Sequence, residues 1–377
     1  MGRIAAAVVL VAAGALLLLG LGTFGIWDPW ELSAADLARQ IASGDAPALD
    51  RPPLGPWLVA RGFALLGVHE WSGRLPMALA GLCAVALAYV TAARFAGRRA
   101  GAWSAIVVAT TPLFLLNARQ MLGAAPGFAT SAAVFLCASA AVFHPAPLRA
   151  TPKHRRTLTI AWMVGLAVSA VLAALASGVL QGVAPPLLGV AVAILARNEL
   201  APSWSDVRRT GAAAVVLAAA VIAAGGAAHA VWADYASFGL WTGGTPRGGV
   251  PPTWEVAIER LFHSFAPWSS LLPLALARML VGRPRPEPAP IVAGVATRRA
   301  RVTIDHPEEN ALRLGLVGWI AFGYLAQTLF SARYGPATFL PVVGASVAVG
   351  LLLRDVERSS RPWWGAAIVA FFFVGLL

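Results

Sequence analysis

Two carboxylates lie in the segment that follows the first apolar run of the sequence. Asp28 and Glu31 occur in the stretch Trp-Asp-Pro-Trp-Glu, and a carboxylate of this kind can accept a proton from an attacking hydroxyl. The same residues also suit the start of a helix, with Asp28 as N-cap and Glu31 as the acid of a capping box. A capping Asp accepts backbone N–H bonds, which weaken it as a base. Glu31 is therefore the first candidate proton acceptor and Asp28 the second.

An acid and a base precede two prolines further along the same segment, in the order Asp50, Arg51, Pro52, Pro53. Proline disfavours helical backbone in the residue before it, so we expect Arg51 to lie outside a helix. A guanidinium can bind a phosphate through two parallel hydrogen bonds. The motif therefore predicts a rigid mount for an anion-binding Arg51 and a metal-binding or hydrogen-bonding Asp50. An interfacial ion pair beside a Trp anchor is the alternative.

The composition indicates the kind of structure that must position these groups. Of the 377 residues, 58% are hydrophobic and 12% are charged, which differs from the balance of a soluble domain. The apolar residues form runs of about 20, the length of a membrane-spanning helix. The sequence therefore predicts an all-α integral membrane protein with about eleven transmembrane helices, at roughly 4–22, 75–95, 101–117, 126–144, 159–176, 179–196, 211–232, 268–282, 312–330, 337–353 and 363–377.

The basic residues indicate the orientation of these spans. With the N-terminus in the cytoplasm, 21 of the 29 Lys and Arg residues fall in cytoplasmic loops, as the positive-inside rule requires. The net charge of +12 then reflects topology and contact with anionic membrane lipids, and no nucleic-acid partner is needed. The eight arginines on the outer side each need a partner or a function, so any chemistry is expected on that face. They are Arg39, Arg51, Arg61, Arg74, Arg119, Arg247, Arg260 and Arg333.

The loops between the spans differ in length. Residues 1–377 are expected to form a single transmembrane domain, without a soluble outer domain after the last span. The first outer loop, 23–74, should hold a short amphipathic helix, because Ala34, Leu37, Ala38 and Ile41 recur at helical spacing. A second long outer loop is predicted at 233–267, and a Pro- and Arg-rich cytoplasmic loop at 283–311.

The order of several motifs resembles that of a known family. After the acidic motif and Asp50–Trp57 come Gly67–Pro76, Phe95–Gly101, Thr111–Phe114, Leu261–Trp268 and Ser331–Pro341. This order is similar to that of bacterial lipid-linked sugar transferases related to protein O-mannosyltransferases, which include the lipid A aminoarabinose transferases. The resemblance covers about 20–130 well and 170–350 more loosely. It implies the GT-C superfold, with many helices and an active site on the outer face.

The resemblance also implies an activity and roles for residues. Family members move a sugar from a polyprenyl-phosphate donor, and the acceptor here would be a lipid, a glycan or a protein. Arg51, Arg119 and Arg333 would hold the phosphate. The family's first-loop Glu matches Glu31, whereas its Asp falls on Trp30. Some relatives bind a divalent metal through an acid and a later His, which makes Asp50 and His263 candidate ligands.

Two further residues belong to candidate substrate loops. Residues 241–254 are rich in Gly and Pro, which is typical of a lid or of a plain connecting loop. Arg247 in this segment would touch an anionic ligand or pair with Asp234. Tyr334 lies in the stretch Ser331–Pro341, which resembles a basic-aromatic turn of the family.

The leading prediction is a glycosyltransferase of the bacterial inner membrane with its active site facing the periplasm. A non-catalytic relative that binds a lipid-linked sugar or scaffolds a partner is the alternative, because Trp30, Ala124 and Ser177 replace charged residues of the family. A small-solute transporter is less favoured, because the span centres are almost without the ionisable residues that transport sites use.

Overall fold

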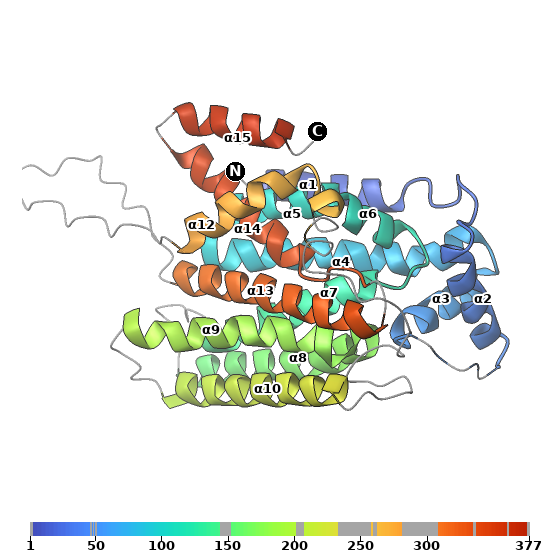
Figure 1. The fold of residues 1–377 in the computed structure, drawn as a ribbon, viewed down its shortest axis with the longest axis horizontal. Coiled ribbons are helices and arrows are strands. Elements are labelled where there is room, and N and C mark those ends of the chain that lie inside the picture. The colour runs from blue at the N-terminus through green and yellow to red at the C-terminus, as the bar shows by residue number, and fades with distance from the viewer. Residues whose placement is uncertain are drawn as a thin grey trace, which may run out of the picture.

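Long apolar helices form the body of the molecule, and two shorter helices, α2 and α3, lie together at one end of it (Figure 1). The computed structural model describes residues 3–45, 47, 49, 51–143, 152–200, 207–232, 258, 262–280, 308–334, 337–359 and 362–374. Most of the predicted loops 233–267 and 283–311 lies outside these residues.

The described elements follow one another as helices. They are α1 (Arg3–Leu18), α2 (Trp30–Ala42), α3 (Leu54–Leu66), α4 (Glu70–Ala96), α5 (Arg98–Thr110), α6 (Pro112–Arg119), α7 (Ala125–Phe143), α8 (Pro152–Gly178), the π-helix η1 (Val179–Val183), α9 (Ala184–Leu200), α10 (Val207–Trp232), the 3₁₀-helix η2 (Trp268–Leu271), α12 (Leu272–Leu280), α13 (Glu309–Tyr334), α14 (Val342–Arg358) and α15 (Pro362–Val374).

The helices confirm the predicted all-α membrane class. Within the described residues, five helical stretches are long and apolar enough to cross a membrane, or six if a bent pair forms one span, with Arg156–Ala196 counted as a single stretch. Each of the eleven predicted ranges coincides with one or more helices, but several of these are short. The total of eleven spans and their orientation therefore stay predictions.

The longest apolar stretch, Arg156–Ala196, folds back on itself after Gly178, which has a φ of +74°. A straight helix would place residues 173 and 182 about 13 Å apart. Instead, a Cβ added to Gly182 would lie 2.6 Å from the carbonyl oxygen of Ala173. The stretch is thus two neighbouring helices, α8 and α9, as the separate ranges 159–176 and 179–196 predicted (Figure 1).

The predicted span 101–117 is not one straight helix. The axes of α5 and α6 differ by 67°, and Thr111 between them has extended backbone with φ −75° and ψ 123°. Pro112 explains the break, because it has no N–H for the helical hydrogen bond and disfavours helical backbone at the preceding residue. The bend carries the end of α6 toward α1.

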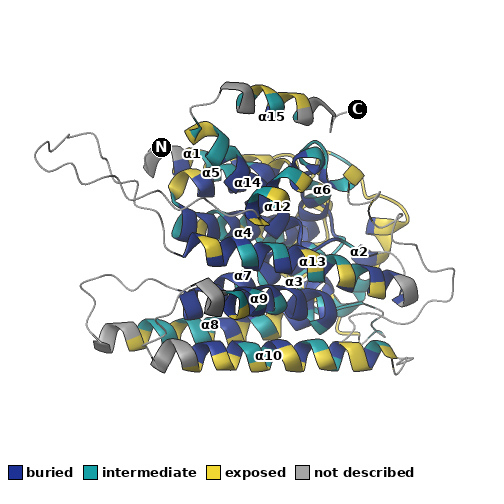
Figure 2. Ribbon diagram, turned by 60° about the vertical axis from the view of Figure 1, so that its left-hand side comes forward, coloured by how far each residue is buried: buried dark blue, intermediate teal, exposed yellow. Residues whose placement is uncertain are grey.

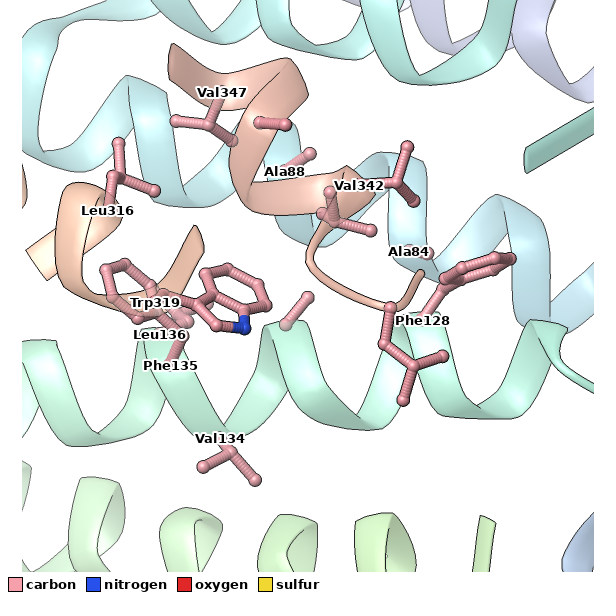
Figure 3. Packing of buried hydrophobic residues seen from close by; sticks show 14 of the residues in the cluster. Ala84, Ala88, Phe128, Val134, Phe135, Leu136, Leu316, Trp319, Val342 and Val347 are labelled. Carbon is pink, nitrogen blue, oxygen red and sulfur yellow. The ribbon is translucent and has the colours of Figure 1, made fainter. Parts of the chain in front are cut away.

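The apolar core lies where α4, α7, α13 and α14 meet. Phe135 stacks on Trp319 with ring centroids 4.8 Å apart, and Figure 3 shows both rings among the buried side chains of the four helices. Glycines allow neighbouring helices to approach closely, because a Cβ at Gly189 of α9 would lie 2.5 Å from the carbonyl oxygen of Gly315 in α13. Buried residues fill the inner faces of the bundle (Figure 2).

A buried group of charges joins the ends of three helices away from α2 and α3. Arg313 donates hydrogen bonds to Glu309 and to Asp355, each at 2.7 Å. Arg354 also binds Glu309, at 2.7 Å, and donates to the carbonyl oxygen of Ala96 at the end of α4, at 2.8 Å. Two acids and two bases balance one another here, so α4, α13 and α14 are joined without an unpaired buried charge.

Candidate functional site

The first candidate proton acceptor, Glu31, is completely buried against an arginine. It lies in the first turn of α2, and Arg74 lies in the early turns of α4. Nε and Nη2 of Arg74 donate to Oε1 and Oε2 of Glu31, each at 2.7 Å. Both side chains are 0% exposed, so this is a bidentate ion pair shielded from solvent.

Arg74 holds the chain between α1 and α2 as well. Its Nη1 donates to the carbonyl oxygens of Leu21 and Phe24 at 2.8 and 2.7 Å, and its Nη2 donates to that of Gly25 at 2.9 Å. The guanidinium also lies 4.1 Å from the ring centroid of Phe24. Every nitrogen of Arg74 therefore has a hydrogen-bond partner, and these hydrogen bonds join the segment from Leu21 to Glu31 to α4.

Glu31 accepts two further hydrogen bonds, from the backbone N–H of Met121 at 3.1 Å and of Trp27 at 3.2 Å. Burial by itself would raise the pKa of Glu31, but the bonds from Arg74, Met121 and Trp27 outweigh it and lower the pKa below 4.5. A carboxylate with this environment is a poor proton acceptor. Its catalytic role stays a prediction, and its observed contacts are those of a group that positions the first outer loop.

The second candidate, Asp28, has a different environment. The prediction that it caps α2 is wrong, because the N-cap is Pro29 and no side chain makes a cap hydrogen bond. Glu31, whose carboxylate reaches back to the N–H of Trp27, satisfies the backbone there instead. Asp28 is exposed in the turn before α2. Its carboxylate is therefore open to a substrate, unlike that of Glu31.

Arg51 lines a small cavity close to this ion pair. Pro53 is the N-cap of α3, so Arg51 lies just outside the helix, as the two prolines predicted. The cavity has a volume of about 40 Å³. Its walls come from α2, from the chain before α3, from the first turn of α3, from the turn after α6 and from α8. They consist of Ala34, Arg51, Pro52, Pro56, Met121, Leu122, Gly123 and Ala176.

Close backbone packing forms one side of this cavity. Gly123 has a φ of +83°, a backbone conformation that favours glycine. A Cβ added to Gly55 would lie 2.9 Å from the Cα of Gly123, so the two backbones pack closely. Met121 contributes a wall of the cavity and also donates its N–H to Glu31. The Glu31–Arg74 pair therefore supports the cavity that Arg51 lines.

Arg119, a second predicted phosphate ligand, is directed toward α1. Its Nη1 and Nη2 donate to the carbonyl oxygens of Leu16 and Leu19, at 2.6 and 2.8 Å. These are carbonyl groups at the C-terminal end of a helix, where a cation is favourable. Arg119 does not line the Arg51 cavity, and its phosphate-binding role stays a prediction.

The remaining candidates are not brought to this cavity by the described structure. Tyr334 is buried at the end of α13 against Phe330, with ring centroids 5.0 Å apart. His263 is exposed. Arg333 is part of α13, but its side chain lies outside the described residues, as do Asp50 and Arg247.

A metal centre has no support from the described part of the chain. No group of three or more His, Cys, Asp or Glu residues that could hold a metal occurs within the described residues. Asp50, one of the two predicted ligands, is outside them. The metal therefore stays a prediction.

Sequence reasoning did not identify two groups that hold Glu31 in place. Arg74 was recognised only as an outer arginine in need of a partner, and the role of the Met121 N–H has no signature in a side-chain pattern. The signal for Arg74 was its position: a cation at the start of an apolar run, on the face that also holds Glu31.

Comparisons with known proteins show a family resemblance and a shared fold. A model of the dolichyl-phosphate-mannose-protein mannosyltransferase family matches residues 50–224. The structure is similar to ArnT from Cupriavidus metallidurans in the apo state, with a TM-score of 0.63 and 19% identity over 97% of this chain and 62% of that chain. It is also similar to ArnT bound to undecaprenyl phosphate, with a TM-score of 0.62 and 19% identity over 99% of this chain and 64% of that chain.

A more distant similarity is to the Archaeoglobus fulgidus oligosaccharyltransferase, with a TM-score of 0.55 and 14% identity over 94% of this chain and 51% of that chain. No curated protein sequence matches the chain. The chain spans less than two thirds of the length of these solved transferases. The resemblance to GT-C glycosyltransferases is confirmed, and the membrane fold is one that they share.

Proposed function

We propose that this chain transfers a sugar from a polyprenyl-phosphate donor to a lipid, glycan or protein acceptor at the periplasmic face of a bacterial inner membrane. The similar ArnT structure with undecaprenyl phosphate supports the donor class. The family match over 50–224 supports transfer of a lipid-linked sugar, and this range includes Arg51 and α3.

The observation that carries the proposal is the position of Arg51 in a cavity between α2, α3 and the turn after α6. The other lining residues are apolar or glycine, so Arg51 is the charged residue of the cavity lining. A guanidinium can bind two phosphate oxygens at once. Negative charge on the donor phosphate grows as its bond to the sugar breaks, and a cation held in place stabilises that transition state.

Asp28 is the proton acceptor in this proposal. The acceptor hydroxyl oxygen forms a bond to the anomeric carbon of the sugar, and its proton passes to the Asp28 carboxylate. The bond between that carbon and the phosphate oxygen breaks, and its electron pair leaves with the polyprenyl phosphate. Asp28 suits this role better than Glu31, because Asp28 is exposed whereas Glu31 is held by four hydrogen bonds.

The test is binding of undecaprenyl phosphate to the full chain in detergent. Arg51→Ala should weaken binding at least tenfold and abolish transfer, while insertion into the membrane is retained. Arg61→Ala is the matched control, because Arg61 is an exposed arginine of α3 that lies 4.9 Å from the Trp57 ring centroid and does not line the cavity. Equal binding by wild type and Arg51→Ala would overturn the proposal.

The environment of Glu31 favours a second candidate, a non-catalytic protein that binds a lipid-linked sugar. Trp30, at the position of the family's Asp, is 71% exposed, and Glu31 is committed to Arg74. Asp28→Asn separates the two functions. A transferase should keep donor binding and lose release of polyprenyl phosphate, whereas a binding protein shows no such release even as wild type.

A further inference from the structure

A groove opens between α8 and α10, remote from the Arg51 cavity. Its volume is about 420 Å³, and it is lined along α8 by Arg156, Ile160 and Met163 and along α10 by Gly211, Ala212 and Val215. These residues belong to the early turns of the two helices. Both helices begin at the end of the bundle away from α2 and α3 (Figure 1).

The groove is mostly apolar along its length, and one cation, Arg156, lies at its mouth. Arg156, Ile160 and Met163 recur at i, i+4 and i+7, so they share one face of α8 over about 10 Å. Arg156 is exposed, and the other five residues named above carry no charge. Thr159 also lines the groove and adds one uncharged polar side chain. Lys153, Arg155, Arg208 and Arg209 occur in the same first turns of the two helices, so this end has a strongly basic sequence.

Part of the groove wall is not covered by other described parts of the chain. Ile160 and Val215 are each 51% exposed. A Cβ added to Gly211 would meet no atom within 4 Å. Apolar surface on a helix long and apolar enough to span a membrane faces lipid tails, and the cations near its start lie at the depth of the headgroups.

We infer that this groove binds one anionic phospholipid, with the headgroup phosphate on Arg156 and an acyl chain along Ile160, Met163 and Val215. The charge of the mouth selects the phosphate, and the apolar walls accept the chain. A zwitterionic lipid brings the same chain but adds a cation beside Arg156, so the site prefers a lipid with net negative charge. This inference does not depend on the proposed transferase activity.

The structure supplies one variant for each half of the site. Arg156→Gln removes the cation and keeps a polar, though shorter, side chain. Gly211→Trp places an indole in the groove, and the Cβ of the new side chain meets no described atom within 4 Å. Gly225→Trp is the matched control, because a Cβ there also meets nothing within 4 Å. Gly225 lies fourteen residues further along α10, which returns to nearly the same face about 21 Å away.

Native mass spectrometry of the full chain, with lipid removed and then titrated back, measures the site directly. Wild type should bind phosphatidylglycerol in preference to phosphatidylcholine. Arg156→Gln should weaken phosphatidylglycerol binding about fivefold, and Gly211→Trp should weaken it at least tenfold. Gly225→Trp should bind as wild type does.

Three results would overturn the inference. They are equal binding of the two lipids by wild type, undiminished binding by Gly211→Trp, and an equal loss with Gly225→Trp. A fourth arm uses undecaprenyl phosphate as competitor. If it displaces phosphatidylglycerol at equal concentration, the groove serves a polyprenyl lipid and the assignment to a glycerophospholipid fails.

Discussion

Replacing Glu31 by Gln tests the role of the buried ion pair with Arg74. The substitution keeps the shape of the side chain but leaves the guanidinium without its counter-charge, in a place where both groups are 0% exposed. Breaking one partner of a buried pair costs about 3–5 kcal/mol. Three backbone carbonyl oxygens still accept hydrogen bonds from Arg74, so we expect a loss near the lower limit, about 3 kcal/mol.

For a chain of 377 residues, a loss of about 3 kcal/mol lowers the melting temperature by about 4 °C. Thermal unfolding of the purified chain in detergent measures it. Asp36→Asn is the control on the same helix, because the Asp36–Arg39 pair is exposed, and we expect no resolvable shift there. If the melting temperature of Glu31→Gln equals that of the wild type, the ion pair does not hold the first outer loop in place, and the reasoning fails.

The remaining predictions concern packing, titration and the end of α1. Gly189→Ala should destabilise the chain by about 1–3 kcal/mol, because the new methyl group meets α13, whereas Gly225→Ala should be neutral or slightly stabilising; paired thermal melts compare them. The pKa of Asp355 is about 2 instead of 3.8: burial opposes this shift, but the charges and hydrogen bonds of Arg354 and Arg313 outweigh it. The stabilising contribution is complete above pH 3.8 and disappears as the pH falls toward 2, so Asp355→Asn should flatten that part of a melting-temperature profile. Arg119→Gln should make α1 more accessible to proteolysis without changing undecaprenyl phosphate binding, and a weakened affinity would instead restore Arg119 as a phosphate ligand.

The long helices were largely predictable, because their sequences are apolar runs of the length that a membrane requires. The turn that separates α8 from α9 was also predicted, although no charge marks it. The break at Thr111 was not predicted, since the run from 101 to 117 stays apolar through Pro112 and hydropathy alone does not register a bend.

The site was less predictable than the helices, because its contacts join residues that are distant in sequence. Arg51 was placed correctly outside α3, since proline restricts backbone locally. The pairing of Glu31 with Arg74 spans 43 residues, and either could have had another partner among the outer charges. Arg119 was expected at a phosphate, but the orphan carbonyl groups at the end of α1 are acceptors that no side-chain motif reveals.

The turn after α6 is attached to its surroundings on several sides. Arg119 ties it to α1, the Met121 amide ties it to Glu31, and Gly123 abuts Gly55. A wall tethered in this way has little freedom to swing outward. Any widening of the small cavity for a phosphate-bearing head must then come from its other walls, which include the stretch where Arg51 precedes α3. The signal of a spectroscopic label in that stretch would change when the ligand enters, whereas the signal of a label on α6 would not change.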